Sequence, residues 1–83
     1  MIVSVLLFAA YREIVGQSRI ELNLPEGATA EDVYDQLQTG HPRLRDARAS
    51  TTFAVNRQVV DPEYTLHGGD EVALLQPASG GSR

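Results

Sequence analysis

Residues 24–40 read LPEGATAEDVYDQLQTG, and they contain the long helix on which the predicted fold depends. Pro25-Glu26-Gly27 has the composition of a turn. Thr29, followed three residues later by Asp32, forms a near capping box, which is the signature of a helix start. Apolar residues then recur at helical spacing up to the final glycine of the stretch; they are Ala30, Val33, Tyr34 and Leu37. The sequence therefore predicts an amphipathic helix that begins at Thr29 and ends near Thr39.

Strand patterns lie on both sides of this helix. IVSVLLF at residues 2–8 places Val3, Val5 and Leu7 on one face. SRIELNL at residues 18–24 alternates apolar and polar side chains, as a half-buried antiparallel strand does. The predicted strands cover residues 2–8, 18–24, 52–55, 58–60 and 71–76.

The connections between these strands are predicted from their turn residues. Residues 9–15 suit one or two helical turns that end at Gly16. Residues 41–51 carry little periodicity and are expected to form a loop with a short turn of helix. Asn56-Arg57 and His67-Gly68-Gly69-Asp70 are predicted turns.

The order of elements predicts an α+β fold with one main helix packed on one face of a mixed sheet. We expect the first and last strands to lie side by side at its centre. A chain of 83 residues has room for one domain, which we place at residues 1–77. Residues 78–83 are expected to form a flexible C-terminal tail, because they have no apolar pattern.

One face of this sheet is left without a covering helix. If Val3, Val5 and Leu7 face the helix, alternation turns a second set of apolar residues outward; it comprises Leu6, Phe8, Val59, Ala73 and Leu75. A contiguous apolar patch on a surface usually marks a partner-binding site. The alternative is that the segment 41–51 covers Leu6 or Phe8.

Composition excludes several classes of function. The seven basic residues are all arginine, and against eleven carboxylates they give a net charge of −4. This charge disfavours binding to nucleic acid or to anionic lipid. The chain has no cysteine, which excludes disulfides, thiolate zinc sites and thiol catalysis. The longest apolar run, Val5 to Ala10, is far shorter than a membrane span or a signal sequence needs. We therefore expect a cytoplasmic protein.

Few residues suggest chemistry within the domain. His41 and His67 lie in predicted loops without the spacing of paired metal ligands, so we expect no metal site. Glu31, Asp32 and Asp35 cluster at the start of the helix, where carboxylates favourably oppose the helix dipole. No nucleophile elbow and no phosphate-binding glycine loop occurs. The domain is therefore expected to hold no active site of its own.

The C-terminal segment carries a different signal. Gly80-Gly81 begins five residues after Leu75, beyond the last predicted strand. Two residues without Cβ atoms can thread a narrow channel and let another protein's active site approach the backbone. A terminal glycine carboxylate can be activated as an acyl-adenylate. A flexible tail without function is the alternative.

Four blocks of sequence together suggest a family. They are VLLFAAYREIVG at 5–16, LPEGATAEDVYDQL at 24–37, AVN at 54–56 and GGDEVALLQPASGG at 68–81. On these blocks the chain resembles the MoaD/ThiS family of ubiquitin-like sulfur carriers over nearly its full length. It is most similar to the members that form the small, sulfur-carrying subunit of molybdopterin synthase.

The resemblance implies a β-grasp fold and a carrier function in molybdenum cofactor biosynthesis. An ATP-dependent, ubiquitin-activating-like enzyme would adenylate Gly81, and a sulfur donor would convert it to a thiocarboxylate. The large subunit of molybdopterin synthase would then transfer the sulfur to cyclic pyranopterin monophosphate. The chain itself would bind no cofactor, since the ATP is used by the activating enzyme.

The resemblance also assigns roles to single residues. By position, Phe8, Val59 and Leu75 match the family's apolar contact patch. Arg12 matches a family arginine that would pair with a partner carboxylate, and a local salt bridge is the alternative. Ser79 and Gly80 would thread the partner's pocket.

The chain departs from the family pattern at two places. Gln76 stands where the family has the first of two prolines, which alters the stiffness of the segment. Ser82-Arg83 follows the diglycine, so Gly81 has no free carboxylate to activate. Trimming by a protease, a remnant of a fusion with the large subunit, and an expression scar each explain these two residues.

Two other functions remain open at this stage. A carrier of the same fold could serve tRNA thiolation or tag other proteins through Gly81. Alternatively, the chain could be a non-catalytic β-grasp interaction module whose terminal segment does no chemistry.

Overall fold

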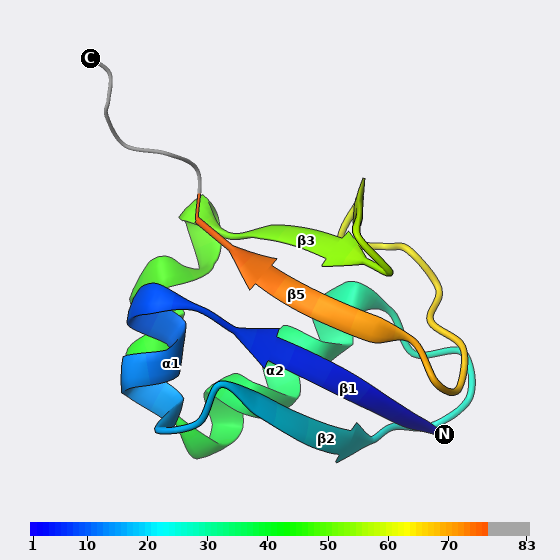
Figure 1. Ribbon diagram of the computed structural model, residues 1–83, viewed down its shortest axis with the longest axis horizontal. Coiled ribbons are helices and arrows are strands. Elements are labelled where there is room, and N and C mark those ends of the chain that lie inside the picture. The colour runs from blue at the N-terminus through cyan, green and yellow to red at the C-terminus, as the bar shows by residue number, and fades with distance from the viewer. Residues whose placement is uncertain (77–83) are drawn as a thin grey trace.

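A five-stranded mixed sheet with one long helix against one face makes up the fold (Figure 1). The computed structural model describes residues 1–76. The elements are β1 (Ile2–Leu7), α1 (Ala9–Val15), β2 (Arg19–Asn23), α2 (Ala30–Gly40), the 3₁₀ helix η1 (Pro42–Ser50), β3 (Thr52–Val55), β4 (Gln58–Val60) and β5 (Glu71–Leu75). The predicted α+β architecture is confirmed, and the predicted strands differ from the observed ones only at their ends.

The strand order is β2-β1-β5-β3-β4. β1 and β5 pair in parallel at the centre, with Val5 opposite Val72 and Leu7 opposite Leu74. The other neighbouring strands pair antiparallel. The prediction that the first and last strands meet at the centre is therefore confirmed. The predicted domain boundary at residues 77/78 lies outside the described residues.

Helix α2 starts at a complete capping box, as the sequence predicts. The Thr29 hydroxyl accepts a hydrogen bond from the Asp32 backbone N–H at 3.3 Å, and the Asp32 carboxylate accepts one from the Thr29 N–H at 2.9 Å. Backbone N–H groups in the first turn of a helix have no partner within the helix, and this box supplies two of the missing acceptors. The same contacts give Asp32 a structural role.

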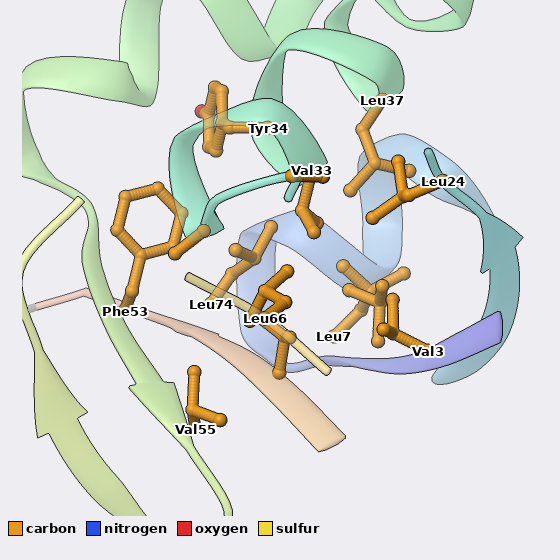
Figure 2. Packing of buried hydrophobic residues seen from close by; sticks show 14 of the residues in the cluster. Val3, Leu7, Leu24, Val33, Tyr34, Leu37, Phe53, Val55, Leu66 and Leu74 are labelled. Carbon is orange, nitrogen blue, oxygen red and sulfur yellow. The ribbon is translucent and has the colours of Figure 1, made fainter. Parts of the chain in front are cut away.

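The core lies between α2 and the inner face of the sheet (Figure 2). Val33, Tyr34 and Leu37 of α2 are buried together with the inward-facing residues of the central strands. The ring of Tyr34 meets that of Phe53 edge to face, with centroids 6.2 Å apart. The inward-facing strand residues are Val3, Val5, Leu7, Phe53, Val55, Val72 and Leu74. Every buried side-chain polar atom among residues 1–76 has a hydrogen-bond partner.

The segment 41–51 corrects the sequence analysis. It was expected to be a loop with a short turn of helix, but Pro42–Ser50 forms a nine-residue 3₁₀ helix. Leu44 is fully buried, and its carbonyl accepts a hydrogen bond of 2.6 Å from the Tyr34 hydroxyl. These contacts hold η1 against α2 and away from the outer face of the sheet. The alternative in which this segment covers Leu6 or Phe8 is therefore wrong, since both line an open depression to which residues 41–51 do not contribute.

An ion pair strengthens the contact between η1 and α2. The Arg48 Nε donates to Glu31 Oε2 at 2.8 Å, and Arg48 Nη2 donates to the other carboxylate oxygen. The guanidinium carbon also lies 4.9 Å from the centroid of the Phe53 ring and 5.6 Å from that of Tyr34, a cation–π geometry. The hydrogen bond from Arg48 lowers the pKa of Glu31 below its ordinary value of 4.5.

We predict that Glu31→Gln lowers the free energy of unfolding by about 0.5–1 kcal/mol at neutral pH, because the pair is partly exposed and screened by solvent. A lowered pKa in the folded state stabilises the protein above the unfolded pKa, and this stability is lost as the pH falls through the folded value. Denaturant titrations should therefore show the difference between wild type and variant shrinking as the pH falls below 4.5. Glu21→Gln, at an exposed residue of β2, is the control; an equal loss in both variants would contradict the prediction.

Candidate functional site

The outer face of the sheet, opposite α2, holds an open depression with a volume of about 480 Å³. Figure 1 views the sheet from this side, with α2 behind it. Phe8 and Val59 are the most exposed large apolar residues of the depression, at 49% and 71% of their surface. We call this depression the outer-face patch; its lining residues are Leu6, Phe8, Ala54, Arg57, Val59, Glu71, Ala73 and Leu75.

The register of the strands explains why the depression forms there. Leu6 of β1 lies opposite Ala73 of β5, Ala73 opposite Ala54 of β3, and Ala54 opposite Val59 of β4. One row of side chains therefore crosses four strands on the outer face. The two alanines in the middle form a low floor between larger side chains at both ends. This arrangement suits the insertion of an apolar side chain from a partner.

Phe8 is held at the edge of the patch by an unusual backbone. It immediately follows β1, and the next residue, Ala9, has a φ of +48° in the left-handed region. This turn lets the chain leave the sheet and start α1 at once, so that the Phe8 carbonyl accepts a hydrogen bond of 3.0 Å from the Tyr11 N–H. Gly16, with a φ of +89°, then ends α1. A left-handed conformation at a residue other than glycine costs about 1–2 kcal/mol.

Charged groups flank the patch. Arg19 donates to Glu71 at 3.0 Å and to the Ser4 hydroxyl at 3.1 Å, which ties β2, β1 and β5 together on the outer face. Arg12, predicted to contact a partner, is exposed on α1. None of the ion pairs within residues 1–76 includes Arg12. The alternative role of Arg12, a salt bridge within the chain, is therefore not observed in this part of the protein.

The end of β5 is tied to α1 and η1 by a buried tyrosine. The Tyr11 hydroxyl lies 2.7 Å from the Thr51 Oγ1 and 3.4 Å from the Leu75 carbonyl oxygen. Thr51 donates to the Ala47 carbonyl at 2.7 Å, so the Thr51 oxygen accepts the proton of the Tyr11 hydroxyl. The side chain of Tyr11 therefore fixes the position at which β5 leads into the segment that carries the diglycine.

We predict that Tyr11→Phe and Thr51→Val each lower the free energy of unfolding by about 0.5–1.5 kcal/mol, since each removes a hydrogen-bonding group from a partly buried pair. The double variant should lose clearly less than the sum of the two, because both changes remove the same bond. Chemical denaturation of all four proteins measures this coupling. Strictly additive losses would show that the two hydroxyls stabilise the protein independently.

The structure brings some of the predicted site residues together. Phe8, Val59 and Leu75 line one depression. Ser79, Gly80 and Gly81 lie outside the described residues. Sequence reasoning missed Ala54, whose outward direction follows from its place between the buried Phe53 and Val55. It also missed Arg57 and Glu71 at the rim, for which the sequence contains no comparable signal.

Residues 1–76 offer no group of three or more histidine, aspartate or glutamate side chains that could hold a metal ion. Within the same part of the chain, no helix is long and apolar enough to cross a membrane. The outer-face patch suggests a function for residues 1–76 as a contact surface for a partner.

Comparison with known proteins identifies the family. The sequence model of the ThiS family matches residues 5–81, which include part of β1, the other four strands, α2 and the diglycine. The chain belongs to the ThiS family. Its mixed sheet with one main helix is the β-grasp fold of the ubiquitin-like proteins, as the resemblance implied.

Relatives of this ThiS family chain are similar over nearly their whole length. The molybdopterin synthase sulfur carrier subunit of Chlamydomonas reinhardtii is 39% identical over 98% of this chain and 100% of its own length. The human protein of the same name is 37% identical over 95% of this chain and 93% of its own. Among solved structures, SAMP1 of Haloferax volcanii is 27% identical, with a TM-score of 0.83 over 98% of this chain and 100% of its own.

Proposed function

We propose that this ThiS family chain is the sulfur carrier subunit of a molybdopterin synthase. In this proposal Gly81 carries the sulfur as a C-terminal thiocarboxylate, and the outer-face patch docks the chain on the large subunit. The observation that carries the proposal is the position of the patch at the end of β5, where Leu75 forms part of it. The sequence places Gly80-Gly81 only a few residues further on. The names of the full-length relatives support the same function.

The chemistry takes place at the carboxylate of Gly81. A carboxylate oxygen attacks the α-phosphorus of ATP and releases pyrophosphate, and a sulfur donor at the oxidation level of sulfide then displaces AMP. We assign ATP to the activating enzyme, with no cofactor bound by the chain itself, and we place the reaction in the cytoplasm. Because an acyl-adenylate needs a free carboxylate, we include in the proposal a protease that cleaves the Gly81–Ser82 bond.

In this proposal the domain and its terminal segment make different contacts with the large subunit. Phe8, Val59 and Leu75 would contact the large subunit, while Arg12 pairs with one of its carboxylates. Ser79 and Gly80 would thread the channel to its active site, since small side chains allow the backbone to approach closely. The exposure of Phe8 and Val59 supports this division, because both side chains are available without unfolding any element.

We expect a chain ending at Gly81 to gain the mass of one sulfur in place of one oxygen. The test incubates it with a ubiquitin-activating-like enzyme of the same source, ATP and a sulfide donor, followed by intact-mass measurement. The 83-residue chain with Ser82-Arg83 is the matched control and should show no change. Sulfur incorporation into the control, or none into the trimmed chain, would contradict the proposal.

Phe8→Asp should abolish binding to the large subunit, because a charge would be buried against an apolar surface without a partner. The melting temperature should stay nearly unchanged, since Phe8 is 49% exposed. Isothermal titration calorimetry and a thermal melt measure the two quantities. A large drop in melting temperature would show that Phe8 stabilises the fold. The loss of binding could then not be assigned to docking through Phe8.

Protein tagging is a second candidate, because SAMP1 of Haloferax volcanii, a small archaeal modifier protein, shares the fold and 27% of the sequence. A carrier for tRNA thiolation belongs to the same group. Mixing the thiocarboxylated chain with the large subunit and the pterin precursor separates the candidates. Pterin-synthase activity supports the carrier subunit, and recovery of the chain linked to other proteins without such activity supports tagging.

A further inference from the structure

A second hollow lies beside the outer-face patch, at the edge of the sheet formed by β4. Its volume is about 470 Å³. We call it the β4 groove; its lining residues are Val59, Val60, Asp61, Glu63 and Tyr64. Val59 lines both hollows, so the groove continues the outer-face patch around the edge of the sheet.

The wall of the β4 groove is held in place by the start of α2. The Tyr64 carbonyl accepts a hydrogen bond of 3.0 Å from the Ala30 N–H, and the Pro62 carbonyl accepts one of 2.9 Å from the Glu31 N–H. The Tyr64 N–H donates to the Asp61 carbonyl at 3.0 Å, which closes a turn. Backbone N–H groups at the start of α2 thus donate to carbonyl groups of the groove wall. Because these hydrogen bonds lie within the chain, the groove is formed before a partner binds.

The groove combines apolar surface with unbalanced negative charge. Val59 and Tyr64 are exposed over 71% and 41% of their surface. Asp61 and Glu63 are exposed as well, and neither takes part in an ion pair within residues 1–76. An arginine or lysine side chain matches both properties, since its stem packs on apolar groups while its charged end seeks carboxylates. The ring of Tyr64 adds a surface for a cation–π contact.

We propose that the β4 groove is a second contact site for the large subunit, and that it receives a basic side chain next to the surface that covers the outer-face patch. The stem lies along Val59 and Tyr64, and the cationic group meets Asp61 and Glu63. This inference rests on the proposed function for the identity of the partner. Complementary charge at the rim of an interface acts mainly on the rate and selectivity of association.

The test is the double variant Asp61→Asn/Glu63→Gln, which removes both charges and keeps the shapes of the side chains. Its matched control is Glu21→Gln/Asp35→Asn, which removes two exposed charges on β2, at the opposite edge of the sheet, and on α2. Binding to the purified large subunit is measured by surface plasmon resonance at several salt concentrations. Melting temperatures of both variants confirm that they are folded.

We expect the groove variant to bind about three- to tenfold more weakly, mostly through a slower association rate, with a shallower dependence of that rate on salt. The control should retain the affinity of the wild type. Unchanged binding of the groove variant, or an equal loss in the control, would overturn the inference. In either of those cases, loss of binding in Phe8→Asp leaves the proposed function standing. If Phe8→Asp also binds normally, the proposed function fails too.

Discussion

A sheet has two faces, and within residues 1–76 only α2 is long enough to cover one of them. Its apolar stripe buries Val33, Tyr34 and Leu37 against the sheet (Figure 2), and each such side chain contributes about 1.5–3 kcal/mol when fully buried. No element of the described part of the chain covers the opposite face. Ala54 and Ala73 reduce the apolar surface at its centre, while Phe8 and Val59 leave apolar surface at its margins. The outer-face patch is therefore a direct consequence of having one long helix for five strands.

Polar contacts stiffen the parts of the chain that the sheet does not hold. The Tyr34 hydroxyl binds the Leu44 carbonyl of the next element, η1, and Tyr11 binds Thr51, 40 residues further along the chain. Burial raises the pKa of Tyr34, so its hydroxyl stays protonated and remains a donor across the ordinary pH range. As a result, Phe8 and Leu75 lie at fixed positions before a partner binds. A surface that is already ordered loses less conformational entropy on association, which benefits affinity.

The success of sequence reasoning depended on whether a feature is local. The capping box of α2 and the alternation in the strands are local signals, and they predicted the elements, the inner face and five residues of the patch. The 3₁₀ helix was missed because Leu44 and Arg48 hold it through contacts with α2 that no local pattern reveals. The β4 groove was missed for a related reason. Asp61 and Glu63 are ordinary loop residues until backbone bonds from the start of α2 fix the wall beside Val59.

The parallel pairing of β1 with β5 also governs how a folded molecule can arise during synthesis. Among the described elements β1 is synthesised first, and its central neighbour, residues 71–75, is synthesised last. Without β5 the sheet would divide into two separate pairs of strands, because β1 and β3 contact each other only through it. A chain that stops before β5 therefore lacks Ala73 and Leu75 of the outer-face patch as well as Val72 and Leu74 of the core. Translation as far as β5 is therefore a condition for forming the complete outer-face patch.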